Sequence, residues 1–237
     1  MKVFFIIFLN LISFVSLSQG VEPVVLISGR VFNDRNLRPI AAKVIYETLP
    51  NGEIAGIARS NPLTGEYSII LPRGKKYDYY AIAEGYYSIP KYLDVTRLTE
   101  YTEIEEQNLF LAPVKKDQVI ILGIKFKRGK AELLPEYYPE LKRLVSFLKE
   151  NKKVEFLIAG HTDNRGNPEE LVKLSEQRAK KIADYLIANG IKEKRIKIKG
   201  FGPSRPIAFN KSKTGRERNN RIEIIILSTG KKEKANK

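Results

Sequence analysis

The sequence predicts two folding units of different class: an all-β sandwich, followed by an α/β unit with the order β-α-β-α-β-β and a mixed sheet. Two observations carry this prediction. Up to about residue 112, short runs rich in Val, Ile and Tyr alternate with turn signals, which is typical of small sandwiches. Beyond residue 114, strand-like runs alternate with runs in which apolar residues recur at helical spacing, which is typical of helices packed on a sheet.

The first 20 residues have the composition of a secretory signal peptide. Lys2 precedes an apolar run over residues 3–17, and Ser18-Gln19-Gly20 supplies the small residues expected at a cleavage site. An uncleaved anchor is the alternative, although the run is short for a membrane span. Since no later run reaches the roughly 18 apolar residues that a spanning helix needs, the mature chain is expected to have no transmembrane segment.

The first unit, residues 21–113, is expected to be built from short strands. The predicted strands are 24–32, 41–49, 54–59, 66–71, 77–83 and 109–111. Turn signals such as Pro50-Asn51-Gly52 and Pro72-Arg73-Gly74 separate them. The tyrosine-rich stretch 77–87 either packs at the core and rim of the sandwich or stacks on sugar rings. We place the domain boundary at Pro113, where the composition changes.

Charge divides the chain at the same point. Residues 21–113 carry 10 basic and 12 acidic side chains, whereas residues 114–237 carry 31 basic and 15 acidic ones. The second half is therefore expected to have an anionic partner. The expected export argues against nucleic acid and leaves anionic lipid or the cell wall.

The second unit, residues 114–229, is expected to precede a basic tail at 230–237. Its predicted strands are 119–126, 154–159, 196–200 and 221–227, and its predicted helices are 135–150 and 168–189. One position is out of pattern, because Arg178 falls on the apolar stripe of the second helix. Such an arginine either needs a carboxylate or ligand beside it or buries its stem and extends its charged end to solvent.

Four segments of the second unit resemble the C-terminal domain of OmpA, which Pal lipoproteins and flagellar stator proteins share. The segments are Gly160-His161-Thr162-Asp163-Asn164-Arg165-Gly166, Leu174-Ser175-Glu176-Gln177-Arg178-Ala179, Gly200-Phe201-Gly202-Pro203-Ser204-Arg205-Pro206-Ile207 and the stretch from Gly215 through Asn219 to Ile224. The resemblance implies non-covalent binding of peptidoglycan through the diaminopimelate of the stem peptide. It also implies a location in the periplasm, peripheral to the outer membrane or the cell wall.

The first unit resembles the carboxypeptidase regulatory-like fold, a transthyretin-type sandwich. The resemblance lies in Gly29-Arg30-Val31, Pro39-Ile40-Ala41, Thr64-Gly65-Glu66-Tyr67, Leu71-Pro72 and Gly85-Tyr86. It implies a spacer or binding module and no peptidase, because a chain with one histidine cannot supply a zinc site with two.

The OmpA resemblance implies that Asp163 and Arg178 hold the ligand, with further contacts from Thr162, Asn219 and Arg221. The chemistry agrees, because one end of diaminopimelate carries an ammonium and a carboxylate on the same carbon. A carboxylate can take the ammonium, while a guanidinium can take the carboxylate through two parallel hydrogen bonds. We call Asp163 and Arg178 the clamp, and we expect Arg165, in the same loop, to stay out of it.

Two positions depart from the family pattern. Leu171 stands where the family often has an asparagine that contacts the ligand, and Asn220 stands where it has an arginine. The chain has no cysteine and one histidine, His161, so we expect no metal, no cofactor and a packing role for His161. We also expect no catalysis, since no nucleophile accompanies His161 and Asp163.

The sequence therefore predicts a wall-binding protein that anchors or organises the bacterial envelope. Its sandwich is expected to contact outer-membrane, secretion or motility proteins. One alternative is an adhesin or assembly component whose sandwich binds a glycan or protein, with the second unit serving only as wall anchor. The other is a wall-degrading enzyme such as an amidase, against which the missing metal ligands and nucleophile count.

Overall fold

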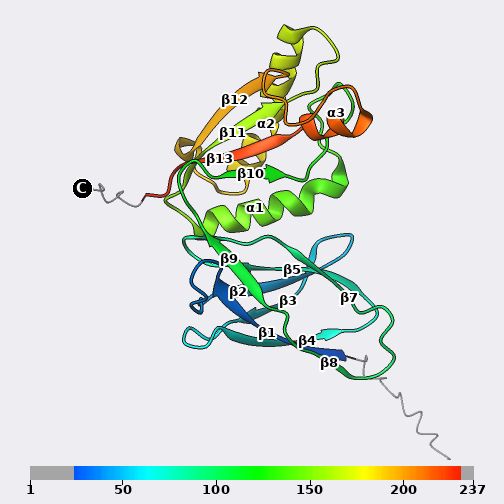
Figure 1. Cartoon of the computed structure of the whole chain (residues 1–237), viewed down its shortest axis with the longest axis vertical. Coiled ribbons are helices and arrows are strands. Elements are labelled where there is room, and N and C mark those ends of the chain that lie inside the picture. The colour runs from blue at the N-terminus through cyan, green and yellow to red at the C-terminus, as the bar shows by residue number, and fades with distance from the viewer. Residues whose placement is uncertain (1–23, 231–237) are drawn as a thin grey trace, which may run out of the picture.

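The structure is a computed structural model that describes residues 24–230. The predicted signal peptide and residues 231–237 of the predicted tail lie outside these residues. The described chain consists of a strand-rich N-terminal half and an α/β C-terminal half, which meet along one helix (Figure 1). Within residues 24–230, no helix is both long and apolar enough to cross a membrane.

The N-terminal half contains two sheets that share one buried core. The first sheet has the order β4-β1-β9-β6, with β8 also paired to β1, and the second has the order β3-β2-β5-β7. The first comprises β1 (Val24–Asn33), β4 (Glu66–Pro72), β6 (Tyr86–Tyr87), β8 (Thr102–Ile104) and β9 (Leu109–Pro113). The second comprises β2 (Lys43–Thr48), β3 (Glu53–Arg59), β5 (Lys76–Ile82) and β7 (Lys91–Asp94). Ile27 and Leu71 from the first sheet join Val44 and Tyr46 from the second in the core.

All six strands that the sequence predicts in this half are present, and β6, β7 and β8 are additional. The strand β8 lies in an acidic segment that has little strand propensity by itself. It forms because Thr102–Ile104 pairs in parallel with the first half of β1, while β9 pairs with the second half. Pairing with an existing strand thus overrides local composition.

The C-terminal half contains a four-stranded mixed sheet. Its elements are β10 (Val119–Leu122), a 3-10 turn (Pro135–Tyr137), α1 (Tyr138–Glu150), β11 (Glu155–His161), α2 (Pro168–Ala188), a second 3-10 turn (Glu193–Arg195), β12 (Ile196–Gly202), α3 (Lys213–Asn219) and β13 (Ile222–Ser228). The sheet order is β10-β13-β11-β12. Only β11 and β12 are parallel, and the other pairs are antiparallel. The predicted α/β class and mixed sheet are confirmed.

One face of this sheet is buried against both long helices. In the central strand β13, Ile222, Ile224 and Ile226 alternate with less buried residues, as expected for a strand with one covered face. They belong to the same buried cluster as Leu148 of α1 and Ile182 of α2. The short helix α3 is not predicted by the sequence, which is rich in Lys and Arg there. Ser212 caps it by accepting a hydrogen bond from the backbone N–H of Gly215.

The helix α1 also packs on the outer face of the second N-terminal sheet (Figure 1). Because side chains alternate along a strand, the neighbours of core residues on β2 and β5 face α1, and Ile45, Tyr80 and Ile82 form a buried cluster there. The ring of Phe147 on α1 meets Tyr87 edge-on, with centroids 5.5 Å apart.

A charged cluster lies within this contact. The Arg143 guanidinium on α1 is 2.8 Å from a carboxylate oxygen of Asp78, 3.4 Å from one of Glu140 and 3.5 Å from one of Glu47. Glu47 is nearly inaccessible and also accepts a hydrogen bond from the Tyr80 hydroxyl at 2.7 Å. The two halves are therefore joined by apolar packing and by buried charge, in addition to the chain itself.

Candidate functional site

The candidate site lies where β11 ends and the loop 162–167 leads into α2. Close packing of α2 against β11 and β12 fixes the positions of these elements. A Cβ added to Gly160 would lie 2.0 Å from the Ser175 carbonyl oxygen, and one added to Gly200 would lie 2.6 Å from the backbone nitrogen of Glu176. Glycine is thus required for α2 to rest directly on β11 and β12. This contact brings the part of α2 that carries Arg178 up to the loop.

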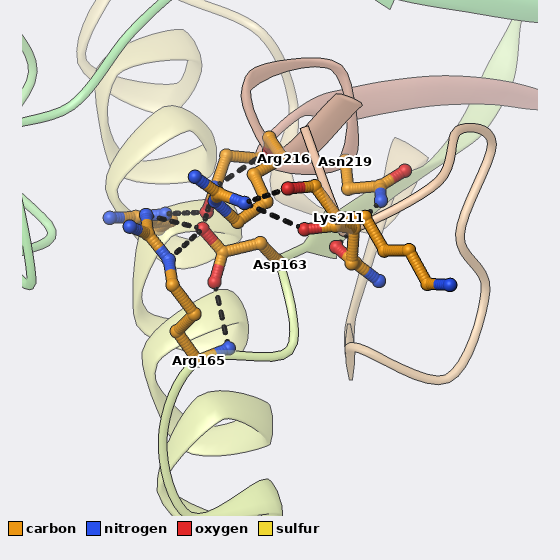
Figure 2. Close-up of polar contacts among 8 residues, drawn as sticks. Asp163, Arg165, Lys211, Arg216 and Asn219 are labelled. Carbon is orange, nitrogen blue, oxygen red and sulfur yellow. Dashed lines mark hydrogen bonds and ion pairs between the residues drawn. The ribbon is translucent and has the colours of Figure 1, made fainter. Parts of the chain in front are cut away.

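Asp163 is buried, with 5% of its surface exposed. Its Oδ1 accepts the backbone N–H of Arg165 at 2.9 Å. Its Oδ2 accepts hydrogen bonds from Nη2 and Nε of Arg165 at 2.8 and 3.2 Å (Figure 2). The same oxygen accepts a hydrogen bond from Nδ2 of Asn220 at 2.9 Å. Burial disfavours the charge, but these hydrogen bonds outweigh it and hold the pKa of Asp163 below its usual value. Asp163 is therefore an ionised, buried acceptor at neutral pH.

Arg178 is equally buried, at 6% exposed. Its Nε donates to the carbonyl oxygen of Lys130 at 3.0 Å, and its guanidinium lies over the Phe126 ring at 5.1 Å from the centroid. Burial lowers its pKa, and the nearby charge of Asp163 partly opposes this. The guanidinium does not extend to solvent, so the second of the two alternatives for this arginine is excluded. Within the described residues it makes a cation–π contact and no direct ion pair to a carboxylate.

Asn220 connects the two residues of the clamp. Its amide nitrogen donates to Asp163, and its amide oxygen lies 3.4 Å from Nη1 of Arg178. A side-chain amide can donate to a carboxylate and accept from a guanidinium at the same time. From the sequence, Asn220 is predicted only to be a lost arginine, and this connecting role is not predicted. The signal that could have revealed it is this dual capacity of an amide next to a predicted acid–base pair.

The clamp opens into a pocket of about 410 Å³. Asp163, Arg178 and Thr162 line it, so three of the predicted site residues come together there. The remaining lining residues are Lys125, Phe126, Arg128, Gly129, Arg165, Leu171, Leu174, Glu217 and Asn220. Leu171 thus presents an apolar surface to the pocket. Arg165 both lines the pocket and bonds to Asp163, so the expectation that it stays out of the clamp is wrong.

Asn219 and Arg221, also predicted as site residues, lie outside this pocket. Asn219 is fully buried, and its amide bonds the loop before α3, accepting from Ile207 and Ala208 N–H and donating to the Ala208 carbonyl. Figure 2 shows Asn219 on the side of that loop, away from the Asp163–Arg165 contact. The Arg221 guanidinium pairs with Glu223 at 2.7 Å. Internal hydrogen bonds therefore occupy both side chains.

His161 lies at the end of β11 and is 1% exposed. Its ring stacks on Phe201 with centroids 5.2 Å apart, and its Nε2 is 3.3 Å from Glu223. Burial lowers the pKa of His161 to about 4, so the ring is neutral at neutral pH. In the described part of the chain, no group of three or more His, Asp or Glu side chains is arranged to hold a metal ion.

Comparison with known proteins places the pocket inside one family region. Residues 125–220 match the model of the OmpA family. This region contains both clamp residues, Asn220 and α2.

Curated relatives match the same half of the chain. Outer membrane porin F of Pseudomonas fluorescens is 35% identical over 115 residues, which cover 48% of this chain and 35% of the porin. Peptidoglycan-binding protein ArfA of Mycobacterium bovis is 40% identical over 103 residues, covering 44% of this chain and 32% of ArfA. The matched segments thus span about a third of the length of these relatives.

A solved structure described as the cell wall anchor of the T6SS from Pseudomonas aeruginosa is 34% identical, with a TM-score of 0.40. The match covers 44% of this chain and 74% of that one.

Proposed function

Because residues 125–220 form an OmpA-like domain, we propose that the protein binds peptidoglycan non-covalently and so attaches to the bacterial cell wall. One observation carries the proposal. A buried, ionised Asp163 and a buried Arg178 line the same pocket and are connected through Asn220. Among the residues that the structure describes, Asp163 and Arg178 are the only buried charged residues that line this pocket, and one buried anion beside one buried cation suits a ligand group that carries both charges.

The ligand group that fits is the free end of diaminopimelate in the stem peptide. Its ammonium pairs with Asp163, and its carboxylate pairs with Arg178. The bond from Nε of Arg178 to Lys130 and the stack on Phe126 fix the plane of the guanidinium. Among residues 24–230, the only other acceptor within hydrogen-bonding distance of this guanidinium is the Asn220 amide at 3.4 Å. The terminal N–H groups are thus weakly engaged and available to a carboxylate.

Names of the relatives support the same function. ArfA is named for peptidoglycan binding, and a peptidoglycan-associated lipoprotein of Legionella pneumophila is 31% identical over 104 residues. By analogy with these proteins, the chain acts by binding rather than by catalysis, in the periplasm at the outer membrane or wall. Thr162 completes the binding site in this proposal, whereas Asn219 and Arg221 support it from outside the pocket by holding the segments around α3.

The N-terminal half is proposed to be a separate domain of residues 21–113 with a carboxypeptidase regulatory-like sandwich. Its two sheets around one core support this. Packed against α1, this domain would present a surface to an outer-membrane, secretion or motility protein while the C-terminal half binds the cell wall.

The test is sedimentation of the full-length mature protein with insoluble peptidoglycan. Asp163→Asn and Arg178→Gln should each lose most of the binding, since truncating one partner of a charged contact costs about 2–5 kcal/mol, or roughly 30-fold and more in affinity. Thermal melts on the same preparations should show that both variants are folded. Free diaminopimelate should compete with the wild-type protein.

The matched control is Lys173→Gln, which removes a positive charge from an exposed position on α2. It should sediment like the wild type. If Lys173→Gln lowers binding as much as Arg178→Gln, or if binding disappears at about 0.3 M salt, where the Debye length is only about 5–6 Å, attraction between a basic protein and an anionic polymer is the better explanation.

A further inference from the structure

The negative half of the clamp has a partner within the chain itself. Three side-chain N–H groups converge on Oδ2 of Asp163: Nη2 and Nε of Arg165, at 2.8 and 3.2 Å, and Nδ2 of Asn220, at 2.9 Å. A carboxylate oxygen with three donors has no room for a fourth. An ammonium that pairs with Oδ2 must therefore displace one of them.

Exposure identifies which donor leaves. The side chain of Arg165 is 55% exposed, whereas that of Asp163 is 7% exposed. Asn220 is held from a second side, because its amide nitrogen also donates to the Arg216 carbonyl oxygen at 3.0 Å. The Arg165 side chain can rotate into solvent while its backbone N–H keeps the bond to Oδ1 of Asp163. The loop thus stays in place when the guanidinium leaves.

We propose that Arg165 is an internal substitute for the ligand's ammonium: its guanidinium neutralises buried Asp163 and is displaced when the ligand binds. This inference rests on the proposed function and adds an affinity-setting residue to it. An ammonium replaces the guanidinium charge for charge, whereas a ligand without one leaves Arg165 where it is. The competition weakens attachment to the wall, so each contact with a stem peptide is readily exchanged for another.

The experiment measures the binding of a stem tripeptide that ends in diaminopimelate to the full-length mature protein by titration calorimetry. A second peptide carries 2-aminopimelate in place of diaminopimelate and so lacks only the free ammonium. The variants are Arg165→Ala, which removes the competitor, and Arg165→Lys, which keeps a cation. Lys173→Ala removes an equal charge at the exposed position on α2.

Arg165→Ala should bind the diaminopimelate peptide roughly two- to five-fold more tightly than the wild type, the equivalent of one partly exposed ion pair. It should bind the 2-aminopimelate peptide no more tightly. Arg165→Lys should fall between wild type and Arg165→Ala, and Lys173→Ala should match the wild type or bind slightly more weakly. General electrostatics makes the opposite forecast for Arg165→Ala, since removing a positive charge weakens the binding of an anionic peptide.

Weaker binding of the diaminopimelate peptide by Arg165→Ala would overturn the inference and make Arg165 a ligand contact. The proposed function would survive that result if Asp163→Asn and Arg178→Gln still abolish binding. Equal affinity of Arg165→Ala and wild type would also reject the inference. If the wild type does not bind the diaminopimelate peptide, both proposals fail.

Discussion

The substitution Arg143→Met tests whether the two halves of the protein stabilise each other. Arg143 lies on α1 and faces three carboxylates, of which Asp78 and Glu47 belong to the N-terminal half. Methionine keeps much of the side-chain length and apolar surface but removes the positive charge. The change therefore leaves the packing between α1 and the N-terminal half nearly intact, so that any loss of stability reports the contribution of the charge.

The expected cost follows from the burial of Glu47, whose side chain is 5% exposed. Removing one partner of a buried pair costs about 3–5 kcal/mol. The value here should lie near 3 kcal/mol, because the distance from Arg143 to Glu47 is a long 3.5 Å and Glu47 keeps its bond from Tyr80. For a chain of this size, about 3 kcal/mol lowers Tm by roughly 6–12 °C.

The pH dependence of this cost has a defined sign. Burial raises the pKa of Glu47 above its usual 4.5, although Tyr80 and Arg143 lower it. A carboxyl with a raised pKa in the folded state destabilises the fold as pH rises above its usual value. Without Arg143 this pKa rises further. The deficit of Arg143→Met should therefore be largest at pH 7.5 and should shrink as the pH falls toward the usual pKa of a glutamate.

Calorimetric melts of the wild type, Arg143→Met, Glu47→Gln and the double variant measure these quantities. The double variant should be more stable than Arg143→Met, because the neutral amide that replaces the Glu47 carboxylate needs no counter-charge and can still accept from Tyr80. A Tm for Arg143→Met within about 2 °C of wild type at pH 7.5 would refute the reasoning. A deficit that grows toward pH 5 would refute the assignment to Glu47.

Three further outcomes are expected. Asn220→Ala should weaken binding of the diaminopimelate peptide up to about tenfold in calorimetric titration, since it removes the amide between the clamp residues; unchanged affinity would show that the amide does not orient them. Gly160→Ala should destabilise the fold by about 1–3 kcal/mol or more in urea unfolding, because its Cβ meets Ser175 at 2.0 Å. As the pH falls from 6.5 to about 4, the stability of the wild type should fall, because His161 takes up a proton in the unfolded chain and not in the folded one. In urea titrations His161→Gln should flatten this decline. An equally steep decline in the variant would contradict the assignment to His161.

Local pattern was sufficient to predict most of the fold. The spacing of apolar residues in α2 and β13 and the turn residues between the N-terminal strands are short-range signals, and the elements follow them. The additional elements have other causes. β8 depends on pairing with β1, which is far away in sequence, and α3 depends on the Ser212 cap and on the absence of a side chain at Gly215, where a Cβ would lie 1.9 Å from the Phe209 carbonyl oxygen.

The site was predicted in part. Asp163 and Arg178 could be singled out because a charged residue on an apolar stripe and an acid after a strand are visible in the sequence. The contacts of Asn220 and Arg165 with Asp163 could not, because they depend on side-chain direction in a loop and after a short helix. The contacts of Arg143 with the N-terminal half could not be predicted for the same reason. Nothing in the sequence indicates that an arginine on one unit faces Glu47 and Asp78 of another.

The position of β13 has a consequence for how the chain acquires its structure. This strand is synthesised after the three others of its sheet, yet it lies between β10 and β11. Until residues 222–228 are available, β10 has no partner strand in its sheet, and the apolar faces of α1 and α2 have no complete surface to cover. The OmpA-like half therefore cannot close early, and a chain cut before β13 remains open.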